Sequence, residues 1–371
     1  MNFFWLFNIL VLLGLGYLSD SNNAFKGSYH NIFRVILILL LGYYAGIGSP
    51  IAEDHEGYAT WYMNFTIRDL TSPFQIFSGA GIVEYGYVLL NVVAKGLNLG
   101  ETGFFFLVSV FINALLVNFI YKHRYPVLSL LFLFSFDYCI QEANLVRQMI
   151  ALAIMLNYID CLKARNVKKY IIGVLIASLF HLSALLFLIF IPICFMDLTK
   201  KHLGVRLLLI FALIISVGFS TSLLSSDFLT LLNFGEHYSH FDNSGNHVGT
   251  STSLSLALFF TLPSLLILLF LFNRNWIFTI FITITAIVAN VAVNFDNFSR
   301  VLVYFLPIGI VYIIQYLDKK EYKTSMGKNT ASLLFAVFAL YCGFRLCMNY
   351  IFVDKVALLS KTLSWSNFFL N

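Results

Sequence analysis

The stretch Asn144-Leu-Val-Arg147-Gln148 opens an apolar run over residues 146–162, and Phe180-His181-Leu-Ser183 interrupts the next apolar run, over residues 170–195. Runs of this length that consist mostly of Leu, Ile, Val and Phe are typical of membrane-spanning helices. A charged side chain in such a helix costs about 3 kcal/mol or more, so as a rule it faces a cavity lined by protein. These stretches therefore predict a helical membrane fold and place Arg147 and His181 among its functional residues.

Helical spacing puts the polar residues of both runs on narrow faces. In the first run a single face carries, in order, Asn144, Arg147, Gln148, Ala151, Met155 and Tyr158. In the second run His181 shares a face with small residues that permit close packing, namely Gly173, Ala177 and Ala184. Two readings stay open. Both side chains line a functional cavity, or Arg147 extends to the membrane surface while His181 hydrogen-bonds a neighbouring helix.

The composition excludes a soluble globular protein. Of 371 residues, 60% are hydrophobic and 11% are charged, and the mean hydropathy is +0.84, whereas soluble domains carry about 25% charged residues. The net charge of +5 comes from short basic clusters, so it indicates membrane orientation and not a nucleic-acid surface. The five cysteines form no Cys-x-x-Cys pattern, and nucleotide and metal motifs are missing, so we expect no metal and no cofactor.

The apolar runs predict an all-α, polytopic integral membrane protein with about eleven transmembrane helices plus re-entrant or interfacial segments. The runs lie near residues 2–18, 31–48, 103–121, 126–140, 146–162, 170–195, 205–224, 253–272, 276–293, 300–317 and 331–350. No internal repeat and no linker to a soluble domain is visible, so residues 1–371 are expected to form a single membrane domain. The first run lacks a basic flank and a cleavage site, and we expect it to be retained.

Loop charges predict the orientation, because cytoplasmic loops of membrane proteins are enriched in Lys and Arg. The basic clusters near residues 122–124, 163–169, 200–206, 274 and 319–328 are expected in the cytoplasm. The acidic segment 49–102, with an interfacial helix around Lys95, and the loop 225–252, which has no Lys or Arg, are expected outside. A single crossing by residues 170–195 conflicts with this pattern. Either the charge rule fails there or the run is broken near His181, and we favour the break.

Further polar residues accompany Arg147 at the predicted outer face. Glu142 precedes it, and Arg300 follows a polar interruption between two apolar runs, so both are expected near the mouth of the same cavity. For Arg300 the alternative is a structural anchor at the membrane surface.

The outer segment combines carboxylates with an aromatic ring at Asp54, Tyr58 and Glu84. This combination suits a sugar, because carboxylates accept hydrogen bonds from hydroxyl groups and aromatic rings stack on pyranose faces. A solvated acidic loop is the alternative for Asp54. The loop 225–252 is either a mobile lid or a plain connector.

Several of these motifs, taken in order, resemble the EpsG-type and Wzy-type polysaccharide polymerases. The motifs are Asp54-x-x-x-Tyr58, Glu84-Tyr-Gly-Tyr87, Arg147-Gln148 with Ala151, Phe180-His181-x-Ser183 with Ala184, and Ser299-Arg300 with Tyr304-Phe305. The resemblance extends over residues 30–310. The sequence departs from the family pattern at Tyr85, where we would expect proline.

The resemblance implies a multi-pass glycosyltransferase of the bacterial inner membrane. Such an enzyme joins undecaprenyl-pyrophosphate-linked oligosaccharide repeats into an O-antigen, capsule or exopolysaccharide on the outer side of the membrane, without a nucleotide sugar or a metal. Its expected partners are membrane lipids, a flippase and a chain-length regulator, but no nucleic acid. The residues assigned to catalysis are Arg147, His181 and Glu142, and those assigned to substrate binding are Arg300, Gln148, Asp54, Tyr58 and Glu84.

The chemistry of these side chains agrees with that assignment. A guanidinium group stabilises a departing diphosphate without a metal, and a histidine or carboxylate can serve as the general base for a sugar hydroxyl. Two other classes remain as alternatives. A flippase or transporter of lipid-linked oligosaccharides would commonly show internal repeats, which are missing here. A membrane-bound acyltransferase would share the histidine in an apolar helix, but its acyl donor would come from the cytoplasm.

Overall fold

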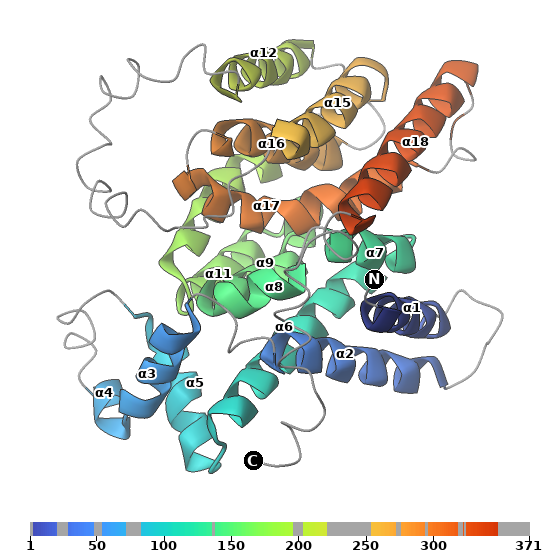
Figure 1. Cartoon of the computed structure of the whole chain (residues 1–371). Coiled ribbons are helices and arrows are strands. Elements are labelled where there is room, and N and C mark those ends of the chain that lie inside the picture. The colour runs from blue at the N-terminus through green and yellow to red at the C-terminus, as the bar shows by residue number, and fades with distance from the viewer. Residues whose placement is uncertain are drawn as a thin grey trace. The chain divides into compact units, whose positions relative to one another are not determined.

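The computed structural model describes residues 3–20, 29–47, 54–71, 83–135, 138–195, 203–220, 254–271, 276–293, 296–317, 322 and 324–347 (Figure 1). All regular secondary structure in these ranges is helical, with sixteen α-helices and one 3-10 helix, so the predicted all-α class is confirmed. The predicted loop 225–252 lies outside the described residues.

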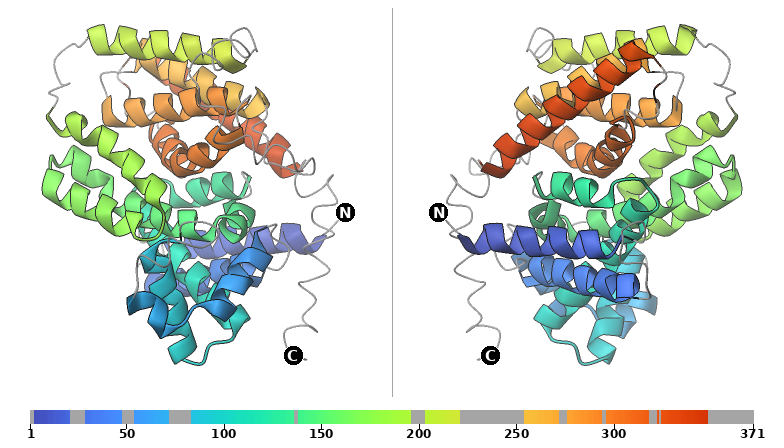
Figure 2. Two further views of the ribbon diagram at one scale, coloured as in Figure 1. Left: turned by 90° about the vertical axis from the view of Figure 1, so that its left-hand side faces the viewer. Right: turned by 90° about the vertical axis from the view of Figure 1, so that its right-hand side faces the viewer.

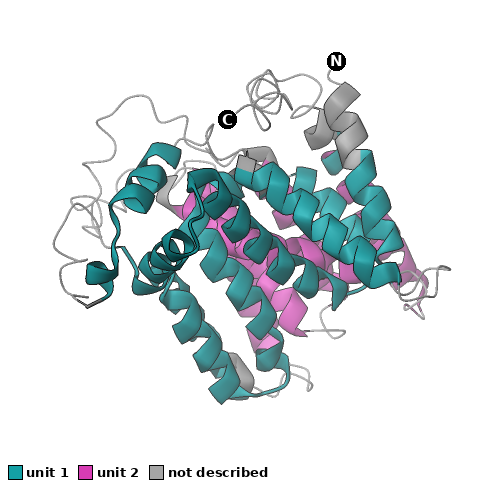
Figure 3. Ribbon diagram, turned by 90° about the horizontal axis from the view of Figure 1, so that it is seen from below, with its two compact units in different colours: residues 1–196, 342–371 teal, residues 197–341 magenta. Residues whose placement is uncertain are grey.

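The chain divides into two compact units, one formed by residues 1–196 and 342–371 and the other by residues 197–341 (Figure 3). The helices up to residue 196 are α1 (Phe3–Leu18), α2 (Tyr29–Ile47), α3 (His55–Asn64), α4 (Ile67–Thr71), α5 (Tyr85–Gly96), α6 (Glu101–Tyr121), α7 (Pro126–Ser135), α8 (Tyr138–Asn144), α9 (Val146–Tyr158), α10 (Asp160–Lys163), α11 (Val167–Ser178) and the 3-10 helix η2 (Leu182–Phe195). The helices that follow are α12 (Leu203–Ser220), α15 (Leu254–Phe270), α16 (Trp276–Ala292), α17 (Asp296–Gln315) and α18 (Ser325–Cys347). The single membrane domain over residues 1–371 stays a prediction.

Four of the described helices are long and apolar enough to cross a membrane: Tyr29–Gly46 in α2, Glu101–Tyr121, Leu203–Ser220, and Phe298–Gln315 in α17. Shorter apolar helices occupy residues 126–135, 182–192, 256–270 and 276–292. The chain is therefore a multi-pass membrane protein. On α12, Leu208, Phe211 and Ile214 are 65%, 61% and 61% exposed, as expected of a surface that faces lipid.

Some of the described helices are shorter than the predicted apolar runs. The run 126–140 is shared between two helices, because α7 ends at Ser135 and α8 begins at Tyr138. A count of hydrophobic residues does not reveal where such a run is divided between helices, so the number of spans stays a prediction.

In the first unit α6 packs between α2 and α9, and α1 lies along α2 (Figure 2). Glycines on α2 allow its close approach to α6. A Cβ atom at Gly42 would lie 2.5 Å from Val110 Cγ2, and one at Gly46 would lie 2.8 Å from Phe106 Cα. Small residues bring helices together in this way in membranes, where the hydrophobic effect does not drive their association.

Residues 170–195 form a helical hairpin. The helix α11 ends at Ser178, and η2 begins at Leu182. The hydroxyl of Tyr170 donates a hydrogen bond of 2.9 Å to the carbonyl of Phe187, although a straight α-helix would separate these residues by about 25 Å. The predicted break near His181 is therefore confirmed. His181 lies in the turn that we call the hairpin tip, residues 179–183.

In the second unit, α16 packs against α12, α15 and α17. The amide of Asn290 on α16 donates to Thr261 Oγ1 on α15 at 2.7 Å and to Ser216 Oγ on α12 at 3.3 Å. Thr285 Oγ1 donates to the carbonyl of Phe305 on α17 at 3.2 Å. Buried hydrogen bonds of this kind hold helices together in membrane proteins, typically at about 1 kcal/mol each.

Candidate functional site

Arg147 lies in the first turn of α9 and forms a partly buried ion pair with Glu84. Its Nη1 atom is 2.5 Å from Glu84 Oε2, and the two side chains are 17% and 7% exposed. Glu84 immediately precedes α5 and has an extended backbone conformation (φ −71°, ψ 141°), so it is not part of the helix. The pair joins residues that are 63 positions apart, and it places the predicted arginine in contact with one of the predicted carboxylates.

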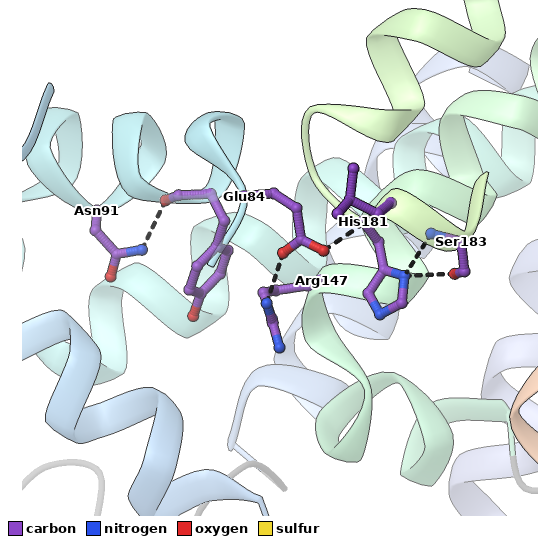
Figure 4. A network of polar contacts seen from close by, with 7 residues as sticks. Glu84, Asn91, Arg147, His181 and Ser183 are labelled. Atoms are coloured by element: carbon purple, nitrogen blue, oxygen red, sulfur yellow. Dashed lines mark hydrogen bonds and ion pairs between the residues drawn. The ribbon is translucent and has the colours of Figure 1, made fainter. Parts of the chain in front are cut away.

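The second oxygen of Glu84 binds the hairpin tip (Figure 4). The backbone N–H of Leu182, at the start of η2, donates to Glu84 Oε1 at 3.0 Å. Two residues further on, the backbone N–H of Gly86 donates to the carbonyl of Leu179 at 2.7 Å. A Cβ atom at position 86 would lie only 2.7 Å from that carbonyl oxygen, so the contact requires glycine. Residues 84–86 thus hold the hairpin tip next to Arg147.

His181 contacts its neighbour Ser183 through Nδ1 (Figure 4). The backbone N–H of Ser183 donates to Nδ1 at 3.3 Å, and the Ser183 hydroxyl also lies in hydrogen-bonding contact with this atom. A backbone N–H can only donate, so Nδ1 is an acceptor, and a neutral imidazole then carries its proton on Nε2. His181 therefore offers a donor at Nε2 and a basic nitrogen at Nδ1, next to the Ser183 hydroxyl.

Three aromatic residues surround the ion pair. The guanidinium carbon of Arg147 lies 4.6 Å from the ring centroid of Trp61, which is a cation–π distance. The Trp61 ring is in edge contact with Tyr58 at 5.4 Å and with Tyr87 at 6.3 Å. Burial raises the pKa of the Tyr58 phenol, an effect that the positive charge of Arg147 partly opposes. Tyr58 therefore stays neutral near pH 7.

Trp61 was not identified from the sequence. It lies three residues after Tyr58 in α3, so helical spacing could have placed both rings on the same side. Nothing in the sequence, however, indicates that this side faces a residue 86 positions away.

The helix that carries Trp61, α3, has polar contacts at both of its ends. Lys95 on α5 donates to the carbonyls of Met63 and Phe65 at 2.8 and 2.7 Å, which satisfies the end of α3. At the other end of α3, His55 Nε2 lies 2.9 Å from Glu101 Oε1. The predicted helix around Lys95 exists as α5, and its placement at the membrane interface stays a prediction.

Four further residues were predicted for the site. Glu142 is 1% exposed on α8, and the amide of Asn113 on α6 donates to both of its oxygens at 3.0 and 2.9 Å. Gln148 is buried in α9, and Asp54 is exposed just before α3. Arg300 is exposed on α17 in the second unit. The structure therefore brings Arg147, Glu84 and Tyr58 together with the tip that holds His181, whereas Glu142 is bound to α6.

Among the residues that the structure describes, no group of three His, Cys, Asp or Glu side chains could hold a metal ion. The absence of a metal and of a cofactor stays a prediction. The geometry does offer a guanidinium ion, an imidazole and a hydroxyl within one region, which suits the binding of an anion and the movement of a proton.

A family model described as the EpsG family matches residues 31–356 of the chain. No curated protein and no solved structure has significant similarity to it.

Proposed function

The chain belongs to the EpsG family, and from this membership we propose that it polymerises lipid-linked oligosaccharide repeat units into a surface polysaccharide. It is a membrane protein of a family linked to exopolysaccharide biosynthesis. In the proposed reaction an undecaprenyl-pyrophosphate-linked glycan is the donor, and a second lipid-linked repeat is the acceptor. Transfer takes place on the outer side of the inner membrane.

The observation that carries this proposal is the Arg147 guanidinium, held beside the hairpin tip by Glu84. A guanidinium group has five N–H donors in a planar fork. A single carboxylate does not use all five donors, and the fork matches the oxygens of a phosphate. Because the group is only 17% exposed, its interaction with an anion is screened less than it would be in water. Arg147 therefore suits the binding of a diphosphate.

In the proposed reaction the bond between the anomeric carbon and the diphosphate oxygen breaks, and a hydroxyl oxygen of the acceptor forms the new bond to that carbon. The diphosphate departs with the bonding electrons, and Arg147 stabilises the negative charge that develops on it. The diphosphate ester is itself the activated donor, so the reaction needs no nucleotide.

The attacking hydroxyl loses its proton in the same step, and His181 is the proposed recipient. The basic nitrogen of His181 is Nδ1, which is in contact with the Ser183 hydroxyl. A proton can pass from the acceptor to Ser183 Oγ while the serine proton moves to Nδ1. The opposite nitrogen, Nε2, then donates a hydrogen bond to a substrate oxygen.

The other predicted residues have supporting roles in this proposal. Asp54, exposed near Tyr58, would accept hydrogen bonds from sugar hydroxyls, and Gln148 would contact the donor. A role of Arg300 in substrate binding stays a prediction. Glu142 is a weaker candidate for the base than His181, because its carboxylate is buried against Asn113. A flippase and a chain-length regulator stay proposed partners.

Deletion of the gene in its own strain tests this function. We expect gel analysis of surface polysaccharide to show that the long-chain ladder is lost while a product of one repeat remains, and that the intact chain restores the ladder. An unchanged ladder would contradict the proposal. Accumulation of repeat units on the cytoplasmic face alone would indicate a flippase or transporter instead.

A further inference from the structure

Glu84 is the one described side chain whose two carboxylate oxygens join Arg147 to the hairpin tip. Its Oε2 accepts from Arg147 on α9, and its Oε1 accepts from the N–H of Leu182 at the start of η2. Arg147 lies on α9 and His181 lies in the turn between α11 and η2, so their relative position depends on what connects α9 to the hairpin tip. The contact between Gly86 and Leu179 adds a second link between the start of α5, next to Glu84, and the hairpin tip.

This arrangement leaves Glu84 poorly suited to bind sugar. The side chain is 7% exposed, and both of its oxygens already accept a hydrogen bond. Each oxygen could still accept a second hydrogen bond, but a sugar hydroxyl would have to reach a side chain that is only 7% exposed, and displacing the arginine would break a buried ion pair. The structure therefore favours a role for Glu84 that differs from the substrate binding expected from the sequence.

Trp61 restricts Arg147 from a second direction. An ion pair alone leaves a guanidinium group free to rotate about the line that joins the two charges. The Trp61 ring lies 4.6 Å from the guanidinium carbon, a cation–π contact separate from the Nη1 contact with Glu84, so it limits this rotation. Contacts with Tyr58 and Tyr87 hold the Trp61 ring in turn.

We infer that Glu84 and Trp61 are positioning residues, which fix the edge and the face of the Arg147 guanidinium and hold the hairpin tip at a set distance from it. This inference rests on the proposed function for its activity measurement. A misplacement of about 1 Å at a reacting group can cost about a hundredfold in rate, so such a clamp has a measurable consequence.

The activity test uses Glu84→Gln, which preserves the size of the side chain. Glutamine replaces one of the two acceptor oxygens by an NH2 group, which can only donate, so either Arg147 or the Leu182 N–H loses the acceptor that it has in the wild-type protein. In polymerisation of purified lipid-linked repeats we expect kcat to fall by about a hundredfold, while KM changes less than about threefold. Glu101→Gln is the matched control, because the Glu101 carboxylate also contacts a side chain of another helix, His55 on α3, and the variant should leave kcat within about threefold.

Trp61 is tested by comparing two replacements. Trp61→Phe keeps an aromatic face under the guanidinium, and Trp61→Leu removes it. We expect the leucine variant to lose about tenfold in kcat and the phenylalanine variant to recover most of that loss. Equal losses in both variants would overturn the assignment of Trp61.

A second measurement does not depend on catalysis. Amide hydrogen exchange of the full-length protein in detergent reports how firmly residues 179–184 are held. In Glu84→Ala the tip loses its carboxylate acceptor, so we expect these amides to exchange at least about tenfold faster than in the wild-type protein, with no change in Glu101→Gln.

The two measurements separate the inference from the proposed function. Unchanged exchange in Glu84→Ala, or a raised KM with normal kcat in Glu84→Gln, would overturn the inference and return Glu84 to substrate binding. Faster exchange at the tip, combined with a wild-type protein that forms no polymer, would support the clamp and refute the proposed function alone.

Discussion

Replacement of Arg147 by lysine separates a catalytic guanidinium from a positive charge that only anchors its helix. Lysine keeps a cation that can pair with Glu84, but it has no planar fork with which to bind a diphosphate. We expect Arg147→Lys to lose almost as much activity as Arg147→Ala. The loss of one charge-assisted contact to the transition state corresponds to about 3 kcal/mol, or roughly a hundredfold in rate.

The two variants should differ in the amount of folded protein. Glu84 is 7% exposed, so Arg147→Ala leaves a buried carboxylate without its cation, and this costs about 3 kcal/mol or more in stability. Arg147→Lys retains the pair and should accumulate to nearly the wild-type level. Activity is therefore measured as polymer formed from purified lipid-linked repeats, divided by the amount of folded protein in the membrane.

Arg34→Lys is the matched control for this experiment. Arg34 stacks on an aromatic ring as Arg147 does, with its guanidinium carbon 4.3 Å from the Tyr121 centroid, but it lies on α2 and has no contact with Glu84 among those described. We expect activity within about threefold of the wild type for this variant. Activity of Arg147→Lys in the same range would remove Arg147 from the catalytic role and move that assignment to Arg300.

Two further predictions concern the hairpin tip and the topology. Gly86→Ala should cost at least about tenfold in activity, because its Cβ would lie 2.7 Å from the Leu179 carbonyl oxygen. The control is Gly96→Ala in the same helix, whose Cβ has nothing within 4 Å and which should be neutral. Equal effects of the two variants would refute the tight contact. Gly204→Cys, at the exposed start of α12, should react with a membrane-impermeant thiol reagent only after the cells are permeabilised, whereas Gly57→Cys on α3 should react in intact cells. Labelling of Gly204→Cys in intact cells would show that the basic segment 200–206 lies outside.

The class of the protein and most of its helices could be predicted because they depend on local properties of the chain. A long apolar run buries its own backbone hydrogen bonds in a helix, whatever surrounds it. The break at the hairpin tip could also be predicted, because basic clusters on both sides of residues 170–195 conflict with a single crossing of the membrane. Arg147 and His181 were identified because a polar side chain among apolar neighbours is unfavourable unless it has a function or a partner.

The roles of Glu84, Glu142 and Trp61 depended on packing. Glu142 is close to Arg147 in sequence, but its carboxylate binds Asn113 on α6, because the turn between α8 and α9 directs the two side chains to different neighbours. Trp61 lies in a segment whose sequence shows only that it is aromatic and acidic. No local sequence pattern predicts which residue such a ring will contact in the folded protein.

That this chain is a helical membrane protein of the EpsG type follows from its sequence alone, because apolar length, loop charge and motif order can be read one segment at a time. The link that Glu84 makes between Arg147 and the hairpin tip is visible only in the folded protein. Those contacts span 63 and 98 positions, and they form only because the start of α5, the start of α9 and the turn before η2 meet at one place. Whether these segments meet depends on how the helices pack, including the close approach that Gly86 allows. Helix packing involves several segments at once, so it cannot be read from any one of them.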